Sequence, residues 1–228
     1  AGYVYSLSCA LYGIREIQGQ DFSRVIVLAP SHRQHLPNQI CAAQAAAIET
    51  PLGESKLDQE AAGEIDRLFR LKFSDDIHLG EHAAQIQYPL IQYALPQAKI
   101  LPLIVGTMQV EPLRAAAKAI KSAWDANTLL LISSDFTHYG DNFGYRPFAN
   151  RHQEQVRKMD LQAFALLQKQ EPDAFMDFLA KSGATICGHY ALALMLYMLD
   201  ADAGLRLLHY CNSADNPRDN NFVCYLAA

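Results

Sequence analysis

The amino-acid sequence predicts a layered α/β sandwich in which a central, mostly buried β-sheet is flanked by helices. Three apolar segments predict buried strands: RVIVLA at 24–29, KILPLIVG at 99–106 and LLLI at 129–132. Amphipathic patterns at 58–69 and 111–124 predict helices between them. This alternation of strand, polar turn and helix is typical of a layered α/β domain, and the run at 129–132 is expected in the middle of a parallel sheet.

The remaining segments fit the same architecture. The small apolar residues of 39–48 are compatible with a strand or a helix, and we interpret them as a strand that ends in a turn at 50–53. A helix is expected to begin at His82 and to continue despite Pro89. Further helices are predicted at 151–168, from 172 and at 190–199, and further strands at 205–210 and 222–226.

Length and composition narrow the class of protein. The chain has 228 residues, half of them hydrophobic, which suits one domain spanning 1–228, and it begins at Ala1 without a methionine, so we expect an N-terminal segment to be missing. A net charge of −5 without a basic tract argues against a nucleic-acid partner. The longest apolar run, at 190–199, is about half of the ~20 residues that a membrane span needs. We therefore expect no membrane partner. Five dispersed cysteines without a CxxC pair indicate reduced thiols, so we expect a cytoplasmic protein.

A polar cluster follows the apolar run at 129–132. Ligands of open α/β sheets bind outside the carboxyl ends of the strands, and Asp135 and His138 lie at such an end. A carboxylate three residues from an imidazole can fix its tautomer, so this pair predicts an acid/base or metal site. The alternative is that Ser133, Ser134 and Asp135 merely cap the next helix.

Three other segments place polar groups in similar positions. His32 follows the strand at 24–29, His82 opens a helix beside Glu81, and Asp215 lies in the most polar loop of the chain. A helix N-terminus favours the neutral imidazole, which is the form that binds metals. Taken singly, these residues are compatible with a surface histidine, a cap and a solvated turn, but together they place polar groups from distant segments at one rim of a sheet. Cys187, two residues from His189, is a weaker candidate for a nucleophile.

A series of motifs along nearly the whole chain resembles the Memo family, also called AmmeMemoRadiSam system protein B. In order, the motifs are AGYVYSLSC, LAPSHRQH, ETPLG, LDQE, GEHAAQIQYPLIQYALP, ILPLIVG, SSDFTHYG and TICGHYALALML. Members of this family are similar in fold to LigB-type class III extradiol dioxygenases, in which two histidines and a carboxylate hold ferrous iron and a further histidine acts in acid/base chemistry. The resemblance implies that His32 and His82 are metal ligands and that the catalytic candidates Asp135 and His138 line the same pocket.

The third ligand and the metal are implied less directly. The family's AGY motif normally follows Pro-His, which this sequence lacks because it begins at Ala1. Animal members place a cysteine in the C-terminal loop and bacterial members an SGD-like sequence, which Ser213-Ala214-Asp215 resembles. We therefore favour Asp215 over Cys211, because two imidazoles and a carboxylate form the facial triad suited to Fe(II). Copper or zinc would also accept these ligands.

Two functions of different classes follow. The first is an Fe(II)-dependent oxidoreductase that acts on a small, phenolic substrate, with His138 moving protons and Phe143, Tyr145 and Phe148 stacking on the ring. The second is a non-catalytic protein that uses a vestigial dioxygenase pocket to bind metal or a peptide. An accessory role beside a radical-SAM partner is a further alternative that the name of the bacterial system suggests.

Overall fold

The computed structural model describes residues 2–214 and 219–228, which divide into two compact units. The large-sheet unit comprises residues 14–133 and 190–198. The small-sheet unit comprises the described residues of 1–13, 134–189 and 199–228. The single domain predicted from the sequence stays a prediction.

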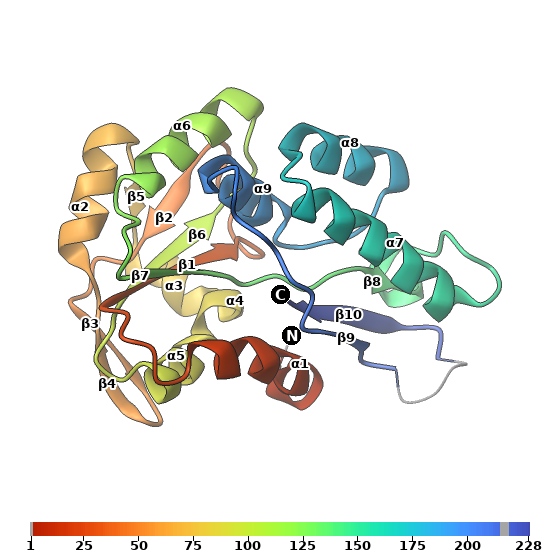
Figure 1. The fold of residues 1–228 in the computed structure, drawn as a ribbon, viewed down its shortest axis with the longest axis horizontal. Coiled ribbons are helices and arrows are strands. Elements are labelled where there is room, and N and C mark those ends of the chain that lie inside the picture. Colours follow the sequence, from red (N-terminus) through yellow and green to blue (C-terminus); the bar gives the residue numbers. More distant parts are fainter. Residues whose placement is uncertain (1, 215–218) are drawn as a thin grey trace. The chain divides into compact units, whose positions relative to one another are not determined.

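The large-sheet unit is built on a five-stranded mixed sheet of strand order β5-β2-β6-β1-β7 (Figure 1). Strand β1 pairs in parallel with β6 on one side and β7 on the other, whereas β2 is antiparallel to β6 and parallel to β5. A hairpin of two further strands, β3 and β4, precedes the first helix of this unit. The strands are β1 (Arg24–Pro30), β2 (Ile40–Ala42), β3 (Ala47–Thr50), β4 (Gly53–Lys56), β5 (Lys72–Phe73), β6 (Lys99–Val105) and β7 (Thr128–Ile132).

Helices flank this sheet. Helices α2 and α6 contact each other, and the short helices α3, α4 and α5 contact one another in sequence; Figure 1 shows the two groups on opposite sides of the strands. Helix α9 contributes Tyr197, whose ring lies under the Arg114 guanidinium of α6. The bounds are α2 (Gln59–Leu68), α3 (Asp75–Gly80), α4 (His82–Gln85), α5 (Tyr88–Ala94), α6 (Val110–Lys121) and α9 (His189–Met198), while α1 (Tyr3–Ile17) runs from one unit into the other.

Strand β1 is the centre of the core. Residues 25–29 have no solvent exposure, because strands pair on both edges of β1 and apolar side chains cover both faces. At its start, the Arg24 Nε donates to the Asp58 carboxylate over 2.7 Å, and Asp58 also caps α2 by accepting from the Ala61 N–H. Burial opposes ionisation of Asp58, but its bonds to Arg24 and Ala61 outweigh this and lower its pKa.

The small-sheet unit is organised around a three-stranded antiparallel sheet of order β8-β10-β9. Tyr139 of β8 stacks on Phe222 of β10, and both are almost fully buried. Asp160 of α7 is also buried and accepts hydrogen bonds from the Thr137 and Tyr210 hydroxyls. The elements are β8 (His138–Tyr139), the 3₁₀ helix η1 (Asp141–Phe143), α7 (His152–Gln168), α8 (Pro172–Ser182), β9 (His209–Asn212) and β10 (Phe222–Ala227).

The predicted architecture is confirmed, but the position of one strand is not. The apolar run at 129–132 belongs to β7, which lies at the edge of the sheet and whose residues after Thr128 are only partly buried. A continuous apolar run in the sequence therefore does not tell how many strands pair with it. Nor do Ser133, Ser134 and Asp135 cap a helix, because the chain continues from them into β8.

Three segments differ from their predicted form. Segment 39–48 holds two strands, β2 and the start of β3, because the chain turns at Gln44 and Ala45, where both N–H groups donate to Asp75. The helix expected to run past Pro89 is broken into α4 and α5, with the proline in the first turn of α5, where its missing N–H costs nothing. The strand expected at 205–210 begins only at His209.

Within the described residues, none of the helices is both long enough and apolar enough to pass through a bilayer.

Substitution of two glycines, one in a crowded position and one in an open position, tests the packing of the large-sheet unit. A Cβ on Gly106 would lie 1.9 Å from the Leu36 carbonyl oxygen, so we expect Gly106→Ala to lower the free energy of unfolding by about 3 kcal/mol or more. Gly63 lies inside α2 with no atom within 4 Å of such a Cβ, and Gly63→Ala should stabilise by about 1 kcal/mol. Urea denaturation of both variants measures the difference, and equal effects would contradict the close approach of residues 36 and 106.

Candidate metal centre

The carboxylate of Glu81 is the centre of a polar cluster in the large-sheet unit. Glu81 precedes α4 as its N-cap, and its Oε1 accepts from the Ala83 N–H over 3.1 Å. The side chain is only 2% exposed, so its charge depends on hydrogen bonds for solvation. The Glu81 side chain therefore links the first turn of α4 to the buried part of the polar cluster.

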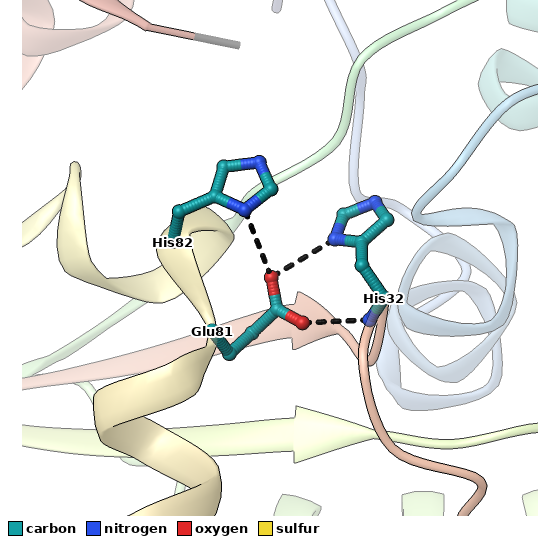
Figure 2. A group of neighbouring side chains, drawn as sticks. All are labelled: His32, Glu81 and His82. Carbon is teal, nitrogen blue, oxygen red and sulfur yellow. Dashed lines mark hydrogen bonds and ion pairs between the residues drawn. The ribbon is translucent and has the colours of Figure 1, made fainter.

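Glu81 binds His32 through both of its oxygens. The backbone N–H of His32 donates to Oε2 over 2.6 Å, and the imidazole Nδ1 lies 2.9 Å from Oε1 (Figure 2). An ionised carboxylate only accepts hydrogen bonds, so Nδ1 carries the proton. The lone pair of the neutral ring is then on Nε2, which is a metal-binding atom.

The second imidazole, that of His82, faces the same oxygen. Its Nδ1 lies 3.5 Å from Oε1 of Glu81, and the His32 and His82 rings are stacked with centroids 5.2 Å apart and planes at 24°. Figure 2 shows the other nitrogen of each ring pointing away from the carboxylate. One buried carboxylate thus faces Nδ1 of two imidazoles, and Nε2 of each ring points away from it.

The ends of three strands hold these residues in place. Ser31, directly after β1, donates its N–H to the Val105 carbonyl and its hydroxyl to the Gln34 carbonyl, which fixes the turn that carries His32. Ser133, directly after β7, donates its hydroxyl to the Ala83 carbonyl over 2.7 Å and accepts from the Gln87 amide over 3.0 Å. Ser133 therefore ties α4 to the sheet rather than contributing chemistry.

Electrostatics keep Glu81 charged. Burial opposes ionisation, but hydrogen bonds from the side chain and backbone of His32 and from the Ala83 N–H outweigh it, so the pKa of Glu81 lies below its usual value. The two imidazoles are more open, with 33% of the His32 side chain and 49% of the His82 side chain exposed. The centre is anionic at its base and accessible at its imidazoles.

This set of donors fits a divalent metal. One ligand atom from each of His32, Glu81 and His82 lies within 4.8 Å of the other two. Imidazole nitrogens suit iron, copper and zinc, and a carboxylate that accepts from Nδ1 is the usual partner of a metal-bound histidine. Glu81 is therefore suited to orient the ligands from behind.

The other predicted pair, Asp135 and His138, lies in the small-sheet unit. The Nε2 of His138 is 3.8 Å from Oδ2 of Asp135, while Nδ1 lies 2.9 Å from the Thr185 carbonyl oxygen. A carbonyl only accepts, so Thr185 rather than Asp135 fixes the tautomer, with the proton on Nδ1. The unprotonated Nε2 of the neutral ring faces the carboxylate, which makes it a candidate base.

The segment around this histidine is paired with 185–188. The Asp135 N–H donates to the Cys187 sulfur over 3.2 Å, and the Gly188 N–H donates to the Ser134 hydroxyl. Two of the aromatic residues expected to stack on a substrate have partners here. The rings of Phe143 and His138 lie edge to face with their centroids 5.3 Å apart, and the Tyr145 hydroxyl donates to the Ser182 carbonyl. These contacts give Ser134 and Cys187 structural partners.

The predicted site residues thus fall into three groups. His32 and His82 lie together, and Asp135 lies beside His138. Asp215, the expected third ligand, lies outside the described residues. Sequence reasoning missed the central role of Glu81, although an N-cap is usually Ser, Thr, Asp or Asn, so a glutamate there was a usable signal.

These features define an α/β protein with a candidate metal centre at the carboxyl end of its central strand. The family described as Memo-like protein matches residues 1–228, so this chain belongs to the Memo-like family, as its motifs indicated. It is 28% identical to Protein MEMO1 of Homo sapiens over 86% of this chain and 69% of the human protein. It is also 27% identical to a MEMO1 family protein of Schizosaccharomyces pombe (88% and 74%) and 28% identical to one of Thermoplasma acidophilum (98% and 80%).

The lowered pKa of Glu81 predicts a pH-dependent contribution to stability in the metal-free protein. The contribution is present above the unfolded-state pKa of about 4.3 and is lost as pH falls through the lower folded-state pKa. We expect Glu81→Gln to lower the free energy of unfolding at pH 7 and the gap from wild type to narrow below about pH 4. Urea denaturation between pH 3 and 7 measures this, with exposed Glu64→Gln as the control; a gap independent of pH would contradict the ionised carboxylate.

Proposed function

We propose that this chain is a metal-binding protein whose centre is built on His32 and His82. The supporting observation is the shared carboxylate: Glu81 holds a proton on Nδ1 of His32 and faces Nδ1 of His82, so that Nε2 of both rings is directed away from it. Buried charges in proteins are paired or coordinate metals, and the Glu81 carboxylate is 2% exposed. Asp215, from the sequence, is the proposed third ligand.

Fe(II) is the favoured metal, with copper and zinc as the other candidates. Two imidazoles and a carboxylate leave coordination positions open for substrates in non-heme iron oxygenases. A bound ferrous ion would supply redox chemistry and activation of O₂ and of a small, phenolic substrate. Within this chain, Glu81 would orient the imidazoles through their Nδ1 atoms, so that Nε2 of each ring is directed away from the carboxylate.

The proposed reaction class is oxidation of the small substrate, with His138 as the acid/base group. The Thr185 carbonyl keeps the His138 proton on Nδ1, which leaves Nε2 to accept a proton, for example from a phenolic hydroxyl. The Asp135 carboxylate, 3.8 Å away, would stabilise the imidazolium that forms.

A second candidate is metal or peptide binding without turnover, including an accessory role beside a radical-SAM partner. The exposure of the His32 and His82 side chains favours this candidate, because a donor set open to solvent suits exchange of a metal or contact with a partner.

Loss of either imidazole should weaken metal binding. We expect His32→Ala and His82→Ala each to reduce Fe(II) affinity by about 100-fold or more, and Glu81→Gln, which disturbs only the orienting group, by about 10–100-fold. Anaerobic calorimetric titration and metal analysis measure this. His35→Ala, on the same exposed loop as His32, is the matched control and should bind as wild type. Unchanged affinity in both alanine variants would sink the ligand assignment.

Turnover separates the two candidate functions. In iron-loaded wild type we expect O₂ uptake with a catechol or another member of a phenol panel. His138→Ala should lower kcat by about 10²–10⁴-fold while leaving metal content unchanged. Bound iron without turnover on the whole panel would favour the non-catalytic candidate, and full activity of His138→Ala would contradict the role of His138.

A further inference from the structure

Two cysteines far apart in the sequence meet in the small-sheet unit. Cys211 of β9 packs against the buried cluster that contains Cys9 of α1, and each thiol affects the pKa of the other, so the two side chains are neighbours. Cys9 is 2% exposed and Cys211 is half-buried, in a cluster that also includes Tyr225 and Ala227. The pair thus has one thiol accessible to solvent and one behind it.

The secondary structure explains why the pair is in register. Cys9 and Tyr12 are three residues apart on α1 and share one face of the helix, while His209 and Cys211 are two apart on β9 and share one face of the strand. The Tyr12 and His209 rings stack at 4.2 Å, and the Cys9 thiol is 4.0 Å from the His209 carbonyl oxygen. The helix is therefore held against the strand at His209, two residues from Cys211.

The neighbouring cysteine of β10 does not compete for this contact. Tyr225 is the cross-strand partner of Cys211, so Cys224 points to the opposite face of the sheet. On that face Cys224 interacts with Tyr210 and Asp160. Cys41 lies elsewhere, buried in the large-sheet unit, where its thiol donates to the Ser74 carbonyl.

We propose that Cys9 and Cys211 form a reversible disulfide that joins α1 to β9 when the protein meets a peroxide or a disulfide oxidant. With a peroxide, the Cys211 sulfur attacks one oxygen, the O–O bond breaks, and a sulfenic acid and one water form. The Cys9 sulfur then attacks the Cys211 sulfur, the S–O bond breaks, and a second water leaves. The two thiols lose two hydrogens and two electrons, which reduce one peroxide to two waters.

The surroundings make this reaction slow at neutral pH. Burial raises the pKa of Cys9 to about 12 and raises that of Cys211 above its ordinary value, so both are thiols at pH 7. The rate should rise about tenfold per pH unit below the pKa of Cys211, because the thiolate is the reacting form. The pair is thus reduced by default and responds to sustained oxidation.

Peptide mapping of the 228-residue chain tests the proposal. After treatment with hydrogen peroxide or oxidised glutathione and alkylation, a non-reducing digest should contain the Cys9 peptide linked to the Cys211 peptide, and denatured thiols should fall from five to three. A reductant should restore all five. The linkage should persist in Cys41→Ser, and oxidation should raise the Tm of wild type by several degrees but not that of Cys211→Ser.

The wild-type chain alone can overturn the proposal, so the result does not depend on whether Cys9→Ser folds. Recovery of Cys9 and Cys211 as separately alkylated peptides, under conditions that oxidise half-buried Cys187, would refute it. So would a bridge between Cys211 and Cys224, because that pairing requires a different arrangement of β9 and β10.

Discussion

The carboxylate of Glu81 is buried, so the other residues of the large-sheet unit must solvate its negative charge with hydrogen bonds. Three donors do this: the backbone and imidazole of His32 and the N–H of Ala83. They come from two places in the chain, the turn after β1 and the first turn of α4. The position of the helix relative to the strand is therefore fixed by the same bonds that orient the imidazoles, and stability and function are coupled at this point.

The sheet order explains why β1 carries this site. As the strand between β6 and β7 it has no free edge, and its side chains are wholly buried over most of its length. Its carboxyl end is thus anchored by the paired and buried residues that precede it. The serines that follow β1 and β7 add hydroxyl bonds to this support, which keeps the donor groups in place before any cation arrives.

Much of this could be predicted from local patterns. The strands at 24–29 and 99–106, the amphipathic α2 and the placement of His32 and His82 after a strand and at the head of a helix all follow from periodicity and capping. The position of Glu81 before a helix was a usable signal, but its burial arises from the packing of α4 on β1, a contact between segments 49 residues apart that local patterns do not report. The edge position of β7 was missed for a similar reason, since strand order is a property of pairing and not of composition. The break between α4 and α5 was a misjudgement of Pro89, which starts one helix instead of being tolerated within another.

The reversed direction of β2 and β5 has an effect on where change is tolerated. Because Ala42 of β2 pairs with Leu103 and Ile40 with Val105, β2 delivers the chain to the rim opposite the one that carries His32. The hairpin of β3 and β4 follows β2 in the chain and Leu57, just after the hairpin, bridges to Ile100 near the start of β6. Insertions or substitutions in that hairpin therefore act on a part of the sheet remote from the imidazoles. The end of the mixed sheet beside the hairpin is therefore free to diverge in length and surface. The end that carries His32 is constrained by the chemistry of the candidate metal centre.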